Sequence, residues 1–340
     1  MLPLWVRGGK PIVIPLPQKR HLTLPTLPLL LLLLAAGFLL HPLLVSPSPP
    51  SAPPGKYTSS PFLVKPSDFI DPPPPDRPSY IPEPVQPKKR GMLVPDAVHY
   101  VYGLKPVPEG QRGEELPYYA YLAMRSALIN LSPKAIYFIY GRPLKHFAHK
   151  ADVLRLLAMK YSGGIYLDID IYVTKPFDDL LYYPTTLGME ASPDSRRSAL
   201  DPEGLCNAII ISQPNSLFID RWLASYETFD GGIWAQHSVV KPWQLAREHP
   251  TEVQVLSERA FFWPMWHGDE IKKTHETSQH DFKASGQYAY HAWESLAMGY
   301  LSKLSPTSIR ENENSFNRMV RPFIGPKDDE TYKKWKKGGN

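Results

Sequence analysis

An apolar run without a single charged side chain, residues 24–45, constrains this 340-residue chain more than any other feature. As a helix rising 1.5 Å per residue, it would reach roughly 33 Å, enough to cross the hydrocarbon core of a bilayer. Four basic residues precede the run: Arg7, Lys10, Lys19 and Arg20. Because the next charge is Lys56, the positive-inside rule predicts a cytosolic N-terminus and a lumenal or extracellular remainder.

A cleaved signal peptide is the alternative interpretation of this N-terminus. The stretch before the run, residues 1–23, is long for the start of a signal peptide, and no clear small-x-small cleavage site follows the run. We therefore predict a cytosolic tail over residues 1–23 and a transmembrane signal anchor over residues 24–45, in a single-pass type II orientation.

Residues 46–91 are rich in proline, serine and charged side chains. Such a segment cannot bury enough apolar surface to offset the entropy that ordering would cost. We predict that it is a disordered, extended stem that holds a folded domain away from the membrane. The single cysteine, Cys206, excludes an internal disulfide, so that domain must be held together by its core.

The net charge of +5 is small for a chain of this length, and much of it lies at the two ends. Residues 326–340 form a basic tail, which we interpret as a solvated terminus rather than a surface for nucleic acid. We therefore expect no nucleic-acid partner.

Residues 92–325 alternate strand-like and helix-like patterns and are predicted to be the folded domain. Short apolar runs predict strands at residues 97–102, 135–140, 165–167, 207–211 and 253–256. Helical spacing and end signals predict helices at residues 117–129, 147–161 and 218–226. This alternation predicts an α/β fold with a mostly parallel sheet, whose ligand crevice lies at the carboxyl ends of its strands.

Two acids, Asp168 and Asp170, directly follow the predicted strand at residues 165–167. Side chains two residues apart on a strand point to the same side, so both carboxylates are expected to face one site. Paired carboxylates suit Mn²⁺ or Mg²⁺, which would stabilise the charge of a departing diphosphate. A D-x-D triplet alone also fits a solvated acidic turn.

Asp152 and Arg155 lie three residues apart on the preceding helix and therefore share a face. Together they offer an acceptor and a forked donor to a hydroxyl-rich ligand in the same crevice. The alternative is a surface ion pair with no role in binding.

These residues carry a family resemblance. The pattern A-D-x-x-R at residues 151–155, followed by G-G-I-Y-L-D-I-D at 163–170, resembles the core of the family 32 glycosyltransferases. Three further segments resemble that family: the opening strand at residues 94–102, the strand led by Asn207, and a late His-x-Trp element formed by His291 and Trp293.

The resemblance implies a GT-A fold, a nucleotide-sugar donor, a divalent metal, retention of anomeric configuration, and a glycan or glycolipid acceptor. It gives Asp168 and Asp170 the metal-diphosphate role. It implies donor contacts by four residues: Asp152, Arg155, Tyr166 and Asn207. His291 is either a further metal ligand or a buried structural histidine, and Asn207 is either a sugar contact or a structural amide.

The resemblance also implies a Golgi membrane location and allows a hetero-oligomer with other Golgi glycosyltransferases. One departure qualifies it. Only residues 141–146 separate the strand at 135–140 from the helix at 147–161, where the family leads us to expect another helix and strand. A catalytically weak or inactive membrane-tethered partner subunit is therefore the second hypothesis. A metal-dependent phosphohydrolase is the third, although it gives no reason for the stem or for Asp152 and Arg155.

Overall fold

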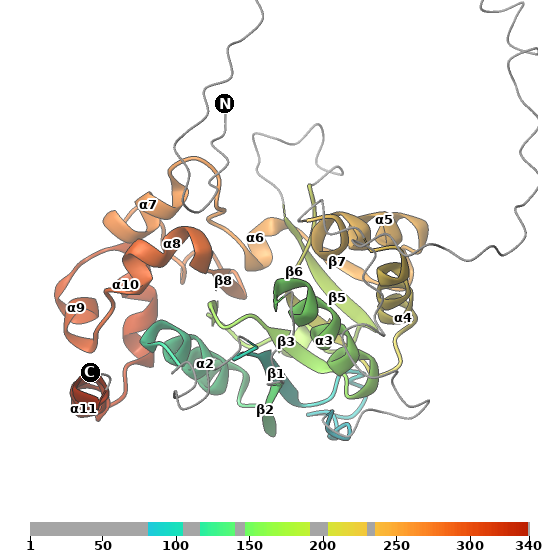
Figure 1. Cartoon of the computed structure of the whole chain (residues 1–340), viewed down its shortest axis with the longest axis horizontal. Coiled ribbons are helices and arrows are strands. Elements are labelled where there is room, and N and C mark those ends of the chain that lie inside the picture. Colours follow the sequence, from blue (N-terminus) through green and yellow to red (C-terminus); the bar gives the residue numbers. More distant parts are fainter. Residues whose placement is uncertain (1–80, 105–115, 140–146, 191–202, 230–234, 339–340) are drawn as a thin grey trace, which may run out of the picture. The chain divides into compact units, whose positions relative to one another are not determined.

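The computed structural model describes residues 81–104, 116–139, 147–190, 203–229 and 235–338, all within the unit Ser59–Asn340 (Figure 1). The predicted tail at residues 1–23, the anchor at 24–45 and the short connection at 141–146 lie outside the described residues. In the part of the chain that is described, no helix has the length and apolar character needed to span a membrane.

A six-stranded sheet in the order β2-β1-β3-β6-β5-β7 forms the centre of this unit. Its strands are β1 (Ala97–Val101), β2 (Ala135–Ile139), β3 (Gly164–Leu167), β5 (Thr185–Glu190), β6 (Gly204–Ser212) and β7 (Gln254–Leu256). The pairs β1–β2, β1–β3 and β5–β7 are parallel, whereas β6 runs antiparallel to both β3 and β5. The prediction of a mostly parallel α/β sheet is confirmed, with β6 as the antiparallel exception.

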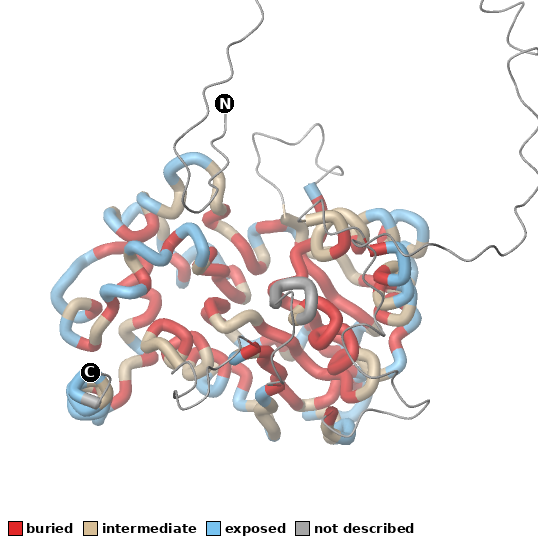
Figure 2. Tube along the Cα trace, in the orientation of Figure 1, coloured by how far each residue is buried: buried red, intermediate tan, exposed pale blue. Residues whose placement is uncertain are grey.

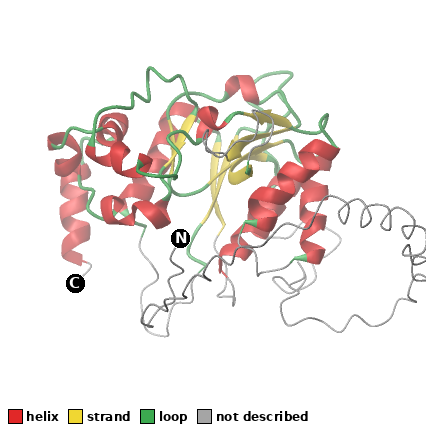
Figure 3. Ribbon diagram, turned by 90° about the horizontal axis from the view of Figure 1, so that it is seen from above, coloured by secondary structure: helices red, strands yellow, loops and turns green. Residues whose placement is uncertain are grey.

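Helices lie on both sides of the sheet (Figure 3). One side carries α3 (Phe147–Tyr161), α4 (Leu217–Ala224) and α5 (Lys241–Glu248), and the other carries α2 (Tyr118–Leu131). Side chains of β3 alternate between two apolar clusters: Tyr166 packs with α3 and α4, whereas Ile165 and Leu167 pack toward α2. The central strands are buried on both faces (Figure 2), as expected when helices cover a sheet from two sides.

A second, two-stranded sheet pairs β4 (Ile171–Val173) with β8 (Ala289–His291) in antiparallel register. A helical C-terminal region follows β7 and packs beside α2. Its helices are α6 (Glu258–Phe261), α7 (Glu270–Glu276), α8 (Glu294–Leu301), α9 (Pro306–Glu311), α10 (Ser315–Val320) and α11 (Asp328–Gly338). Short helical turns complete the described chain at η2 (Asp178–Leu180), η3 (Ser225–Thr228), η4 (Gln236–Val240) and η5 (Arg321–Phe323).

Residues 81–91, which the sequence assigns to the end of the stem, pack against the domain. Ile81 is fully buried, the Ser162 hydroxyl donates to the carbonyl of Pro82, and Pro87 forms an isolated bridge with Pro95. At the other end, Asp328 in the predicted basic tail is buried within α11. In the described structure the domain therefore includes residues on both sides of the predicted 92–325 range.

Candidate active site

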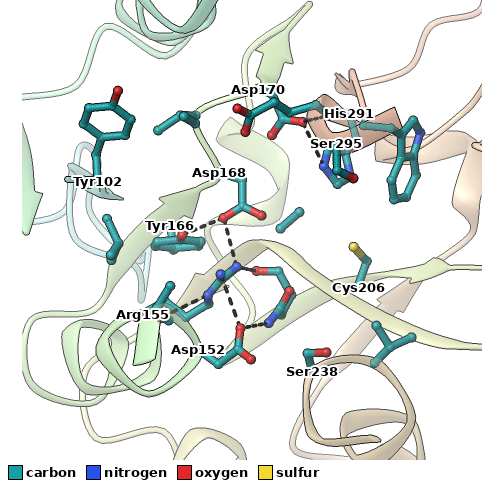
Figure 4. Close-up of a pocket in the computed structure, with 18 of the residues that line it drawn as sticks. Tyr102, Asp152, Arg155, Tyr166, Asp168, Asp170, Cys206, Ser238, His291 and Ser295 are labelled. Atoms are coloured by element: carbon teal, nitrogen blue, oxygen red, sulfur yellow. Dashed lines mark hydrogen bonds and ion pairs between the residues drawn. The ribbon is translucent and has the colours of Figure 1, made fainter. Parts of the chain in front are cut away.

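A cavity of about 560 Å³ lies where the central sheet meets the two-stranded sheet (Figure 4). Its walls are formed by the chain after β1, by α3, by the turn after β3, by the ends of β5 and β6, and by β8 with the start of α8. All seven residues that the sequence analysis singled out line it: Asp152, Arg155, Tyr166, Asp168, Asp170, Asn207 and His291.

Asp168 and Asp170 reach the cavity from a turn. Strand β3 ends at Leu167, the amide of Asp168 donates to Ala208, and the amide of Ile171 closes the turn on the carbonyl of Asp168 at 3.1 Å. The two carboxylates therefore face one site, as predicted, although a turn rather than strand alternation places them there.

His291 joins the two acids because β8 pairs with β4. The register sets His291 opposite Ile171, the residue after Asp170, and brings its Nε2 to 3.3 Å from Asp170 Oδ2. Ligand atoms of Asp168, Asp170 and His291 lie within 4.8 Å of one another, a spacing that one cation can bridge. Two carboxylates and an imidazole form a donor set that suits Mn²⁺, so these residues fit the predicted metal.

The two carboxyls have opposite pKa shifts. Burial raises the pKa of Asp168, and the charge of Arg155 offsets this only in part. Burial also tends to raise the pKa of Asp170. Its net pKa nevertheless lies below the usual value, because His291 stabilises the carboxylate by charge and a hydrogen bond, and the Glu294 amide donates to Oδ2 at 2.7 Å. Burial would lower the pKa of His291, yet Asp170 outweighs it and the net shift is upward. Asp170 and His291 thus form a buried, hydrogen-bonded pair in the site.

Arg155 connects the remaining predicted residues. Its Nη1 donates to Asp168 Oδ1 and to the carbonyl of Asn207, both at 2.9 Å, and its Nη2 lies 3.3 Å from Asp152 Oδ1 (Figure 4). The guanidinium also lies 4.6 Å from the centre of the Tyr166 ring.

Asp152 and Arg155 are only 7% and 6% exposed, so the alternative of a surface ion pair is wrong. The Asn207 amide donates to Asp152 at 2.7 Å, and the Tyr166 hydroxyl donates to Asp168 Oδ1 at 2.6 Å. This buried network fixes the position of Asp168, and its members also face the cavity.

Several residues of the cavity wall were not predicted from the sequence. Glu190 ends β5, Tyr102 follows β1, and Tyr119 on α2 donates to Glu294 at 2.5 Å. Glu190 is an acid at the end of a strand, much as Asp168 directly follows one, and an acid after Leu187 and Met189 was the sequence pattern that could have pointed to it. Nothing local marks Tyr119 or Glu294, because their proximity depends on how the C-terminal helices pack against α2.

Known proteins resemble the chain over different lengths. Residues 118–187 match the family described as "Glycosyltransferase sugar-binding region containing DXD motif". The chain is 86% identical, over 99% of its length and 100% of the relative, to "Glucan organizing enzyme 1" of Cryptococcus neoformans var. grubii. It is 24% identical over 44% of its length to "Inositol phosphoceramide mannosyltransferase 2" of Schizosaccharomyces pombe, covering 43% of that protein.

Solved structures show more distant similarity. The chain matches the "PaToxG Glycosyltransferase" with 16% identity and a TM-score of 0.32, covering 68% of this chain and 87% of that one. A galactosyltransferase, LgtC, solved with donor and acceptor sugar analogs, matches with 14% identity and a TM-score of 0.32, over 62% and 98% of the two chains.

The alignment with the Cryptococcus relative extends over 366 positions, whereas this chain has 340 residues. The relative therefore contains residues that have no counterpart here. The predicted resemblance to family 32 glycosyltransferases is confirmed by the family match and by the two fungal relatives. The chain is a glycosyltransferase, and it belongs to the family whose sugar-binding region carries the DXD motif.

Proposed function

We propose that the chain is a metal-dependent, retaining glycosyltransferase that moves a hexose from a nucleotide sugar, GDP-mannose or a UDP-sugar, to a glycan or glycolipid acceptor. The observation that carries the metal assignment is the group formed by Asp168, Asp170 and His291 inside the cavity of about 560 Å³. Mannose and glucan occur in the names of the two fungal relatives, which supports a hexose and a carbohydrate-bearing acceptor.

A divalent cation at this site would supply Lewis-acid stabilisation of the negative charge on the leaving diphosphate. The protein's part is to hold the ligands in position before the donor arrives. Both bonds to the Asp168 side chain, from Arg155 and Tyr166, fall on Oδ1, so we assign Oδ2 to the cation. The Glu294 amide fixes Asp170 in the same way.

We place the donor in the part of the cavity next to the carboxyl end of β1. Ligands of open α/β sheets bind at the carboxyl ends of such strands, and Tyr102 lies there, directly after β1. Asp152, Arg155 and Asn207 border the same space and are assigned to the donor sugar or ribose.

We further propose a single-pass type II location in the Golgi membrane. The uncharged run at residues 24–45 and the basic residues before it support this orientation. Association with other Golgi glycosyltransferases would fit the same location.

A catalytically weak partner subunit is the second candidate, because the Cryptococcus relative contains residues that this chain lacks. A donor panel with full-length protein in detergent separates the two. Released nucleotide is measured with Mn²⁺, with a chelator, and in Asp168→Asn and Asp170→Asn. We expect chelation to abolish release and each substitution to slow it about 10²–10³-fold. Each variant also loses the charge of one member of a buried pair, so its melting temperature should fall, but it should still unfold in one cooperative transition. Parental release by both variants would refute the metal assignment, and Mn²⁺-dependent nucleotide binding without any release would favour the partner subunit.

A further inference from the structure

Glu190 is an acid of the cavity that has no part in the metal group. It ends β5, is half-buried, and lies opposite Gly204 in the antiparallel pairing with β6. Among the described residues, the close-set group of potential metal ligands contains Asp168, Asp170 and His291 and does not include Glu190. A second carboxylate therefore lines the same cavity from a different part of the fold.

The Glu190 carboxylate is held in position. The indole N–H of Trp266 donates to its Oε1 at 3.1 Å, and the Trp266 ring packs on the core formed around Phe261 and Phe262. The Cys206 thiol lies against the same carboxylate: burial raises the pKa of this thiol, and the charge of Glu190 raises it further. A carboxylate held in this way keeps lone pairs that can accept from a ligand, and its side chain loses little further entropy on binding one.

Glu190 lies on the wall across the metal group from the side we assign to the nucleotide. In Figure 4, Tyr102 and Cys206 lie on opposite sides of Asp168. Because Glu190 contacts Cys206, its carboxylate belongs to the Cys206 wall. The two walls differ in their place across the sheet: Tyr102 follows β1, whereas Glu190 ends β5, and strands β3 and β6 lie between these two strands.

We propose that Glu190 is the acceptor-binding carboxylate of this enzyme. The carboxylate accepts a hydrogen bond from a hydroxyl of the acceptor sugar and orients that sugar toward the metal group. The assignment presupposes the proposed function, since only a transferase needs a second sugar in this cavity. A carboxylate suits the task because it accepts from hydroxyls strongly and in several directions.

The test compares Glu190→Gln with Glu203→Gln in the full-length protein in detergent. Glu203 is an acid just before β6 that pairs with His267 at 3.1 Å, and it is not among the residues that line the cavity. Each variant is loaded with Mn²⁺ and nucleotide, and the binding of α- and β-linked glucan oligosaccharides is then titrated. Losing a charge-assisted hydrogen bond should weaken oligosaccharide binding by Glu190→Gln about 10- to 100-fold and leave Glu203→Gln at the parental value.

Mn²⁺-nucleotide affinity, measured separately, decides what a failure means. Three results would each overturn the acceptor role. Glu190→Gln could bind oligosaccharide as well as the parent, the parent could bind no oligosaccharide, or Glu190→Gln could lose nucleotide affinity as strongly as oligosaccharide affinity. Absence of Mn²⁺-dependent nucleotide binding in the parent would instead overturn the proposed function. Trp266→Phe keeps the ring and removes the N–H, so it should weaken oligosaccharide binding less than Glu190→Gln and leave nucleotide affinity unchanged.

Discussion

Replacing Arg155 with leucine should destabilise the domain strongly. Arg155 is 6% exposed, and its guanidinium has two carboxylates as partners, at 2.9 Å to Asp168 and 3.3 Å to Asp152. Removing one member of a buried ion pair leaves its partner's charge unpaired and costs about 3–5 kcal/mol. For a domain of this size we expect the melting temperature to fall by roughly 6–20 °C.

The loss should depend on pH in a defined direction. Without Arg155, burial would raise the pKa of Asp168 still further above that of the unfolded chain. The folded state then binds more protons than the unfolded state in the acidic range, so its stability rises as pH falls. Melts of parent and variant should therefore differ more at pH 7 than at pH 4.5. Saturating Mn²⁺ should also reduce the difference at pH 7, because the cation neutralises Asp168.

Arg221→Leu is the matched control. Arg221 forms an ion pair with Glu252 at 3.0 Å, but its side chain is 43% exposed, so its loss should cost less than about 1 kcal/mol. Equal melting temperatures for the two leucine variants at pH 7 would refute the reasoning that burial makes the Arg155 network structural.

Two further predictions concern stability. Ile81→Ala, in the segment that the sequence assigned to the stem, should lower the free energy of unfolding by about 2–5 kcal/mol, because Ile81 is fully buried. Leu93→Ala, at a residue 40% exposed, is the control, and equal denaturant midpoints would show that residues 81–91 do not belong to the domain. Burial lowers the pKa of His275 to about 4. As the pH falls from 6.5 to 4, the imidazole is therefore protonated in the unfolded chain but not in the folded one, and the free energy of unfolding decreases. His275→Phe should remove up to about 3 kcal/mol of this acid sensitivity, and a variant that loses stability as steeply as the parent would contradict the assignment.

The sequence alone determined the elements whose signals are local. Helix α3 occupies the predicted residues 147–161, and the chain leaves it through Gly163 and Gly164, whose φ angles of 61° and 107° suit glycine. The predicted strands at 97–102 and 165–167 match β1 and β3 within a residue. The acids after β3 were found because a chemical motif and a strand end coincide within a few residues.

Other elements escaped sequence analysis because their patterns are weak. Strands β4 and β8 have three residues each, too few for a period to be visible, and β5 contains Gly188 within its run. Residues 81–91 were assigned to the stem because proline-rich composition predicts disorder, whereas the burial of Ile81 depends on a surface built by distant residues.

Tertiary structure decided the composition of the site. His291 meets Asp170 because β4 pairs with β8 across more than a hundred residues of chain, and that register cannot be read from either strand. Spacing showed that Asp152 and Arg155 share a helix face, but only packing decided that the face is buried and that Arg155 holds Asp168. The sequence by itself determined which chemical groups the chain carries and which local elements hold them. Which groups share one cavity depended on long-range packing, because distances across the fold are set by contacts that sequence spacing does not encode.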